Sequence, residues 1–230
     1  WWSAFGDAQL DALIDRAGPG NLDLAVATER VREARAALGV ARSSEMPSVD
    51  ASASYARNRQ SLESRGGAPF FGNRENDLWD AGFDARWEID LFGGLQRSVE
   101  AARADIAALQ EAQRGVSTSL CAEIGRNYVE LRGFQRLLEV TRLRLEMQRQ
   151  VAEIVLVRAD AGVASDLDAL RADAQVSSSR SELPALEAQI ATRVHRLSIL
   201  LGLEPRALAG ELGQSAPIPV AAAALALAQP

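Results

Sequence analysis

The residue types that most often perform catalysis or bind metals are scarce in this chain of 230 residues. Its one cysteine, Cys121, and one histidine, His195, supply neither a disulfide nor the ligand set of a zinc cluster. Asp166 and Asp168 are two positions apart on an expected helix, a spacing that separates their side chains and argues against a carboxylate pair. The sequence has no P-loop, dinucleotide-binding glycine motif or serine-hydrolase elbow. We therefore predict no enzymatic activity, no metal and no cofactor.

Charge and composition exclude further classes of protein. The net charge is −6, and acidic and basic residues are interleaved, which argues against a partner that is a nucleic acid. The longest apolar run, residues 220–228, is too short for a transmembrane helix. The chain has 42 alanines, and 47% of its residues are apolar while only 5% are aromatic. Such small side chains favour helices that pack closely over long distances.

The segment from Trp79 to Leu91 alternates strictly between apolar and polar positions, which predicts a β-strand. A shorter alternation from Val49 to Tyr55 predicts its partner strand. One face of the pair is apolar, at Val49, Ala51, Ala53, Tyr55, Trp79, Ala81, Phe83, Ala85, Trp87, Ile89 and Leu91. The even positions of the second strand carry five charges, at Asp80, Asp84, Arg86, Glu88 and Asp90.

A half-buried strand of a soluble sandwich also alternates, so that interpretation stays open beside a membrane strand. Two features favour a strand that crosses a membrane. The charged face suits a water-filled lumen, in which acidic residues favour cations, although a merely solvated wall explains it equally well. Trp79 and Trp87 are eight residues apart, about 27 Å along a strand, near the height of the apolar band of outer-membrane barrels. Two strands alone are not stable, so other chains or further sequence must complete the sheet.

Helical periodicity covers most of the remaining chain. We expect a short helix over residues 7–16 that Gly18-Pro19-Gly20 ends, and a second over 22–44 that Asn21 caps. One uninterrupted helix is predicted over 94–161, with an apolar seam and a separate stripe of small residues, so that it has two helical neighbours. Gly162 ends it, Ser165 and Asp168 form a capping box, and a last long helix follows over 166–201, kinked at Pro184. The helices over 22–44 and 166–201, stacked end to end, nearly match the length of the long helix.

Three motifs resemble a known family. They are Trp2-Ser3-Ala4-Phe5-Gly6-Asp7, the run Trp87-Glu88-Ile89-Asp90-Leu91-Phe92-Gly93 with Arg97 and Glu100-Ala101-Ala102, and residues 158–172 with Gly162, Ser165 and Asp168. Together they are similar to the outer-membrane factors of bacterial tripartite efflux pumps, the TolC-like family, and above all to its NodT-type lipoprotein branch. That branch has a lipidated N-terminal cysteine, whereas Cys121 falls within a helix, where we expect a small buried thiol.

The resemblance implies a mainly α fold with a small transmembrane β part: the long α-helical hairpin of a periplasmic α-barrel plus two strands of an outer-membrane β-barrel. Family members contain two such repeats and form trimers, so we expect this sequence to be the first repeat of a longer protein. The second repeat carries the family's gate, and we assign no gate residue here. We expect residues 1–46 to form a short helix and a stacked helix, and residues 47–93 to form two strands with an extracellular loop at 58–77. Residues 94–202 would form the hairpin, and residues 203–230 a connector.

The resemblance also implies a function and partners. The protein would be the outer-membrane channel of an RND-type multidrug efflux system, a passive conduit that contacts a periplasmic membrane-fusion adaptor, an inner-membrane pump indirectly, and outer-membrane lipid. The hairpin tip at 158–168 is the predicted adaptor contact, through Arg158, Gly162, Val163, Ser165, Leu167 and Asp168, although a well-capped hairpin alone explains its sequence. A soluble periplasmic coiled-coil adaptor or structural hairpin protein is the alternative function, and a tail-like or secretion scaffold is a weaker one.

Overall fold

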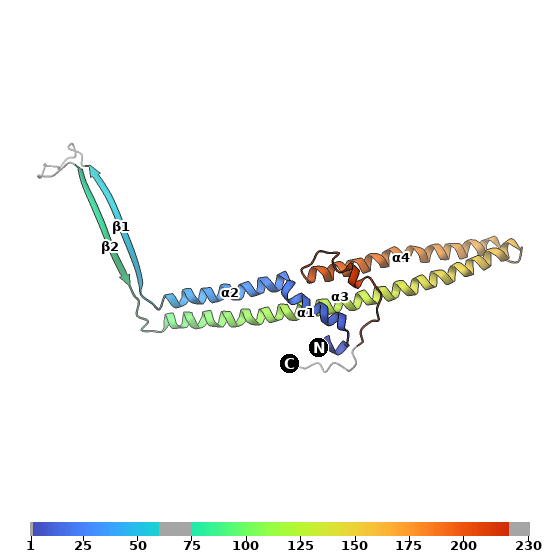
Figure 1. Cartoon of the computed structure of the whole chain (residues 1–230), viewed down its shortest axis with the longest axis horizontal. Coiled ribbons are helices and arrows are strands. Elements are labelled where there is room, and N and C mark those ends of the chain that lie inside the picture. Colours follow the sequence, from blue (N-terminus) through green and yellow to red (C-terminus); the bar gives the residue numbers. More distant parts are fainter. Residues whose placement is uncertain (1, 60–74, 221–230) are drawn as a thin grey trace. The chain divides into compact units, whose positions relative to one another are not determined.

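The computed structural model describes residues 2–59 and 75–220, which divide by their contacts into two units. One unit combines Trp1–Thr28 with Glu111–Pro230, and the other is Glu29–Gln110. In chain order the elements are the 3-10 helix η1 (Trp2–Phe5), α1 (Ala8–Gly20), α2 (Leu22–Ser43), β1 (Ser48–Arg59), β2 (Glu75–Arg86), α3 (Gly94–Asp160), α4 (Asp166–Leu200) and α5 (Ala209–Leu212) (Figure 1). Among the described residues, none of these helices has both the length and the apolar character needed to cross a membrane.

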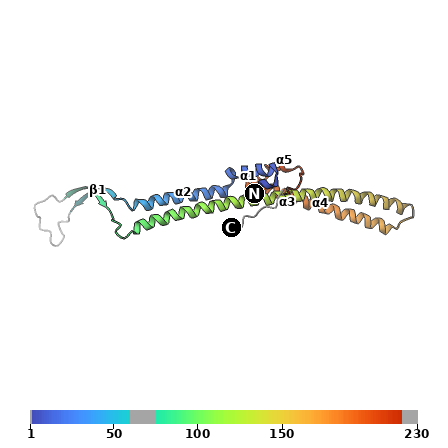
Figure 2. The same ribbon diagram turned by 90° about the horizontal axis from the view of Figure 1, so that it is seen from below.

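In the unit formed by residues 29–110, β1 and β2 pair as an antiparallel hairpin. Tyr55 lies opposite Trp79 and Ala51 opposite Phe83, so the apolar positions of both strands share one face, as the alternation predicts. On the other face, Asp50 lies opposite Asp84. The same unit contains most of α2, which runs beside the first part of α3 in Figures 1 and 2.

The strand predicted over residues 79–91 is wrong at both ends. β2 begins at Glu75 and ends at Arg86, because Arg86 pairs with Ser48, the first residue of β1. Pro47, which precedes Ser48, has no N–H group to continue the ladder, so the residues after Arg86 lack a partner strand. The predicted loop at 58–77 is therefore also too long: Asn58, Arg59 and residues 75–77 are paired, and its remaining residues, 60–74, lie outside the described part of the chain.

The long helix is confirmed, since α3 is continuous from Gly94 to Asp160. The residues of its predicted apolar seam are buried or half-buried: Leu95, Val99, Ala102, Ile106, Leu109, Val116, Leu120, Ile124, Tyr128, Leu131, Leu138, Leu145, Ala152 and Val155. The predicted stripe of small residues is exposed: Ala101, Ala104, Ala108, Ala112, Gly115, Ser119 and Ala122. The apolar seam of α3 thus packs against other helices of this chain. The face with the small residues has no helical neighbour among the described residues.

The core of the other unit lies where α1, the middle of α3, the end of α4 and α5 meet. Leu13, Ile124, Leu131, Leu197 and Leu212 are fully buried there. α4 runs alongside the second half of α3 in both views (Figures 1 and 2), and it remains one helix through Pro184. α5 is a difference from prediction, because residues 203–230 were expected to form only a connector. The apolar pair Leu208 and Leu212 explains it: both side chains enter the core.

The first helix also extends further than predicted. α1 continues through Gly18-Pro19-Gly20, where the sequence indicates a stop. Asp7 caps its start, with its carboxylate accepting from the backbone N–H groups of Gln9 and Leu10 at 2.9 and 3.0 Å. Pro19 falls in the last turn, where its missing N–H group leaves only the carbonyl of the exposed Asp15 without a helical partner. A proline there costs little because water can reach that carbonyl.

Candidate functional site

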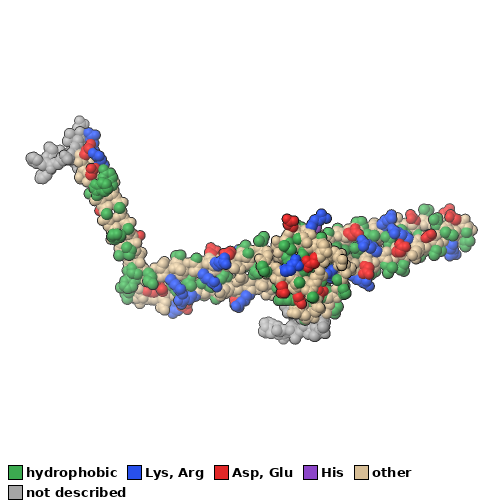
Figure 3. Space-filling model, viewed as in Figure 1, with side chains coloured by type: hydrophobic (Ala, Val, Ile, Leu, Met, Phe, Trp, Pro, Cys, Tyr) green, Lys and Arg blue, Asp and Glu red, His purple; other side chains and the backbone are tan. Residues whose placement is uncertain are grey.

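The apolar face of the β1–β2 hairpin is the first candidate surface. Its side chains are open to solvent in this chain: Phe83 is 85% exposed, Trp79 76% and Val49 66% (Figure 3). Toward the loop, the face ends in an aromatic pair, with the ring centroids of Tyr55 and Trp79 4.4 Å apart. Beyond that pair comes a charged row in which Arg57 contacts the carboxylates of Glu75 at 2.7 Å and Asp77 at 3.6 Å. The hairpin therefore presents an apolar band with a sharp polar edge.

The opposite face of the hairpin is polar, and it holds three of the five predicted lumen-facing residues. Asp80, Asp84 and Arg86 lie on β2 and are exposed. Glu88 and Asp90 are not on this strand, so their placement on the charged face is wrong. The carboxylate of Asp90 instead accepts from the backbone N–H groups of Gly94 at 2.7 Å and Gln96 at 3.0 Å, and thereby caps α3. An aspartate shortly before a helical pattern is a capping signal that would have identified this role.

Three of the predicted membrane-facing residues also leave the strand. Trp87, Ile89 and Leu91 follow the end of β2, so the interval of about 27 Å between Trp79 and Trp87 does not run along one strand. The indole nitrogen of Trp87 donates to the backbone carbonyl of Glu45 at 3.2 Å. The described hairpin thus has one row that pairs two aromatic side chains, Tyr55 and Trp79, and the apolar residues after Arg86 belong to the segment between β2 and α3.

The turn between α3 and α4 brings together all six residues of the predicted tip. Gly162 has φ +73°, and Val163 donates its backbone N–H group to the carbonyl of Arg158 at 2.8 Å. Ser165 caps α4: its hydroxyl accepts from the N–H group of Asp168 at 3.2 Å and donates to the Asp168 carboxylate at 2.7 Å. The hydrogen bond that the Ser165 hydroxyl donates to this carboxylate, together with one from the Ser165 backbone, lowers the pKa of Asp168. Val163 is 67% exposed and Leu167 54%, so a rigid turn presents two apolar side chains.

A buried polar cluster around Arg132 was not predicted from the sequence. The Arg132 guanidinium is 1% exposed and donates to the side chains of Gln9 and Gln135 and to the backbone carbonyl of Gln214. It also lies 4.9 Å from the centre of the Tyr128 ring. The Gln135 amide donates to the Leu212 carbonyl at 2.7 Å. The cluster therefore ties α1, α3 and the segment after α5 together, and the spacing of Tyr128, Arg132 and Gln135 along one helix face was its only signal.

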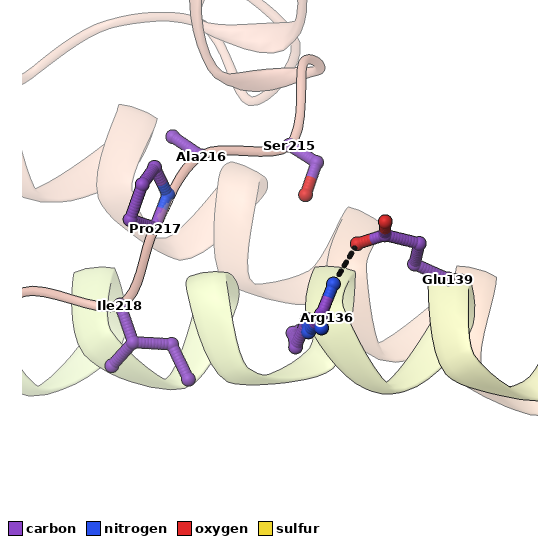
Figure 4. Close-up of a pocket in the computed structure, with 6 residues that line it drawn as sticks. All are labelled: Arg136, Glu139, Ser215, Ala216, Pro217 and Ile218. Atoms are coloured by element: carbon purple, nitrogen blue, oxygen red, sulfur yellow. Dashed lines mark hydrogen bonds and ion pairs between the residues drawn. The ribbon is translucent and has the colours of Figure 1, made fainter.

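The segment after α5 also covers a pocket on α3 of about 540 Å³. Figure 4 shows Ser215, Ala216, Pro217 and Ile218 on one side, and the ion pair between Arg136 and Glu139, 2.8 Å apart, on the other. The arrangement is that of a chain segment lying across a helix.

The half-buried Cys121 and the buried Tyr128 give the folded chain a distinctive response to alkali. Burial raises the pKa of the Cys121 thiol and of the Tyr128 hydroxyl above their ordinary values of 9.0 and 10.0. The unfolded chain therefore releases these protons at a lower pH than the folded chain does, so stability must fall as the pH rises through those ordinary values. The sequence has no lysine that would mask the effect.

We expect the urea midpoint of unfolding to decline above pH ~9 and the decline to become shallower in a Cys121→Ala, Tyr128→Phe double variant. The matched control is Tyr55→Phe, which changes the exposed tyrosine of the hairpin and should leave the slope as it is. An equally steep decline in the double variant would contradict the assignment to Cys121 and Tyr128.

The chain is similar to known proteins in both its sequence and its fold. Residues 13–203 match the family model described as outer membrane efflux protein. The pyoverdine export outer membrane protein OpmQ of Pseudomonas aeruginosa is 30% identical over 211 residues, which are 90% of this chain and 44% of that protein. Nodulation protein T of Rhizobium leguminosarum bv. trifolii is 27% identical over 214 residues, 93% of this chain and 44% of that protein.

A solved structure with the same fold is the outer-membrane channel OprN. It superposes with a TM-score of 0.84 at 32% sequence identity, and the match covers 96% of this chain and 48% of OprN. This chain thus spans slightly less than half the length of the proteins that it matches.

Proposed function

We propose a transport function for this chain because it belongs to the outer membrane efflux protein family. The whole protein is the outer-membrane channel of a tripartite efflux system. It lies in the outer membrane, extends into the periplasm and conducts small molecules passively, while an inner-membrane pump supplies the energy through an adaptor. This chain contributes one repeat of that channel, with a sheet part and a helical part.

The observation that carries this proposal is the β1–β2 hairpin with its two chemically opposite faces, both open in the chain. Lipid covers the apolar side, and Asp80, Asp84 and Arg86 line water on the other. A two-stranded hairpin is marginal by itself, so strands from other parts of the full protein or from other copies must complete the sheet. A soluble coiled-coil adaptor has no use for such a hairpin, and this disfavours the alternative function.

The helical part supports assembly as a homotrimer. The exposed stripe of small residues on α3, which includes Ala104, Ala108 and Gly115, lets a second helix approach closely. In a barrel wall each helix contacts two neighbours, and the chain supplies only one of them. The second repeat of the full-length protein or a neighbouring copy supplies the other.

The tip between α3 and α4 is the proposed contact with the periplasmic adaptor. Val163 tests it best, because the residue is exposed and has an ordinary backbone φ. In a strain that lacks the native gene, we expect the wild-type protein and Val163→Thr to restore efflux and to cross-link to the adaptor. We expect Val163→Glu to fail in both assays, because a carboxylate desolvated at an apolar contact is costly.

Fractionation separates the possible outcomes of this experiment. All three proteins should be recovered in the outer membrane with nearly equal melting temperatures, since the side chain at position 163 is largely exposed in the chain. Efflux and cross-linking by Val163→Glu at the wild-type level would refute the adaptor contact. Recovery of the wild-type protein in the soluble fraction would refute the channel itself.

A further inference from the structure

The apolar seam between α3 and α4 is interrupted by a polar layer. Arg144 forms an ion pair with Glu182 across the seam, and this contact fixes the register of the two antiparallel helices. Gln148, one turn closer to the tip on α3, therefore falls opposite Ser179 of α4. Ser179 is 1% exposed and Gln148 is half-buried. The layers next to this pair are apolar, with Leu145 and Leu183 on one side and Ala152 and Val176 on the other.

Neither member of the polar layer has its buried oxygen hydrogen-bonded. The hydroxyl oxygen of Ser179 and the amide oxygen of Gln148 have no partner among the described residues. A buried polar atom without a partner costs free energy, which the rest of the seam must offset. Movement of α4 against α3 at this layer breaks no hydrogen bond of either oxygen and lets water reach both. The polar layer therefore resists separation less than an apolar layer does.

The backbone of α4 is weakened beside the same layer. Pro184 lies inside α4, about one and a half turns from Ser179. It has no N–H group, so the carbonyl of Arg180 lacks its helical partner. Between them, the Ser181 hydroxyl donates to the carbonyl of Ser178 at 2.6 Å, a bond that competes with the helical ladder. Proline and serine are frequent causes of bending in helices, so α4 bends most easily here.

The two sides of the polar layer are held together unequally. In the described part of the chain, four ion pairs join α3 to α4, and all lie on the side away from the tip: Glu123 with Arg196, Glu130 with Arg193, Arg142 with Glu187, and Arg144 with Glu182. On that side, Leu138 and Leu145 of α3 are buried. Towards the tip, the α3 seam has only the smaller, half-buried Ala152, Val155 and Ala159. The tip side is therefore the more loosely held part of the hairpin.

We propose that Gln148, Ser179 and Pro184 form a hinge, about which the tip-side arm of the hairpin, residues 149–178, swings. α4 bends at the hinge, while α3, which has no proline or glycine from residue 134 to its end, flexes as a continuous helix. The swing lets Val163 at the tip follow the adaptor as the pump changes conformation. This last step rests on the proposed function, whereas the hinge itself does not.

Hydrogen exchange of the full-length protein, followed by mass spectrometry, tests the hinge. We expect protection factors about tenfold lower for the amides of residues 177–183 than for residues 144–150 on the facing helix. Pro184→Ala restores a donor to the Arg180 carbonyl and should raise the protection of residues 177–183 several-fold. The matched control is Pro19→Ala, which changes the proline of α1 and should leave that protection unchanged.

A second variant tests the polar layer without touching the proline. The pair Gln148→Leu and Ser179→Ala makes the layer apolar, so it should also raise the protection of residues 177–183. In the efflux and cross-linking assays, we expect Pro184→Ala to reach the outer membrane in the wild-type amount. Its export and its cross-linking to the adaptor should each fall several-fold, because a stiffer arm follows the adaptor less well.

The possible results separate the hinge from the proposed function. Equal protection of the two facing segments in the wild-type protein overturns the hinge, and so does unchanged protection in whichever of the two variants is recovered. Wild-type efflux by a Pro184→Ala protein with raised protection overturns the role of the swing at the adaptor. Absence of cross-linking by the wild-type protein refutes the proposed adaptor contact instead, and it leaves the exchange measurement unaffected.

Discussion

Replacing Arg132 by alanine is expected to lower the free energy of unfolding by about 2–4 kcal/mol, because the change removes charge-assisted hydrogen bonds, leaves the buried Gln135 without its donor and opens a cavity. The side chains of Gln9 and Gln135 and the carbonyl of Gln214 all accept hydrogen bonds from this guanidinium. Of these three residues, Gln135 is buried, Gln9 is half-buried and Gln214 is exposed, so most of the loss falls on the amide oxygen of Gln135 and on the space left by the Arg132 side chain. Thermal or urea unfolding of the purified protein measures the effect.

The matched control for this prediction lies one turn away on the same helix. Arg136 contacts Glu139 three residues on, just as Arg132 contacts Gln135, but its side chain is 61% exposed. Arg136→Ala should therefore change stability by no more than about 0.5 kcal/mol. Arg132→Lys keeps the charge but not the forked geometry, and we expect it to recover only part of the loss. Equal stabilities of Arg132→Ala and Arg136→Ala would show that the buried cluster does not hold the unit together.

Gly202→Ala is expected to lower the free energy of unfolding by about 3 kcal/mol or more, because the added methyl group causes both backbone strain and a steric clash. Gly202 has φ +71°, a conformation that is strained for any residue with a Cβ atom. Its Cβ would also lie 2.0 Å from the backbone carbonyl oxygen of Gly20, at the point where α4 ends beside the start of α2. The buried Asn21 joins those two ends by donating to the carbonyl of Leu200 at 3.0 Å and accepting from the N–H group of Leu24 at 2.9 Å.

Gly162→Ala separates the two penalties. Gly162 has nearly the same φ, +73°, but nothing lies within 4 Å of the position of its Cβ. It should therefore show only the backbone strain, about 1 kcal/mol. The measurement is the midpoint of thermal or urea unfolding of each variant, with outer-membrane yield as a second readout. Equal destabilisation of both variants would show that the close approach of Gly20 and Gly202 adds nothing to the loss of stability.

Features that repeat along the chain could be predicted from the sequence. A period of two places Ala51 and Phe83 on one face whichever strands complete the sheet, and a near-heptad spacing from Val99 to Val155 selects one face of α3. The caps at Asn21 and Ser165 were predictable for a related reason: each depends on a side chain and on backbone groups within three residues of it.

Features that depend on a partner distant in the chain could not be predicted in this way. β2 ends at Arg86 because β1 begins at Ser48, although the alternation in the sequence continues to Leu91. Nothing in residues 87–91 records that their partner strand is missing. The alternation places Asp90 and Trp87 on opposite faces of a sheet. In the structure, which ends the strand earlier, Asp90 caps α3 and Trp87 contacts Glu45.

The sequence by itself determined the classes of secondary structure, the polarity of each face and the resemblance to a family of channels, because these properties follow from local periodicity and short motifs. Only the tertiary structure decided where the sheet stops, that Arg132 is buried, and that Gly20 and Gly202 must both be glycine. Each of these depends on distances between segments up to some 180 residues apart, as for Asn21 and Leu200. A pattern in one segment carries no information about such distances until the chain has folded.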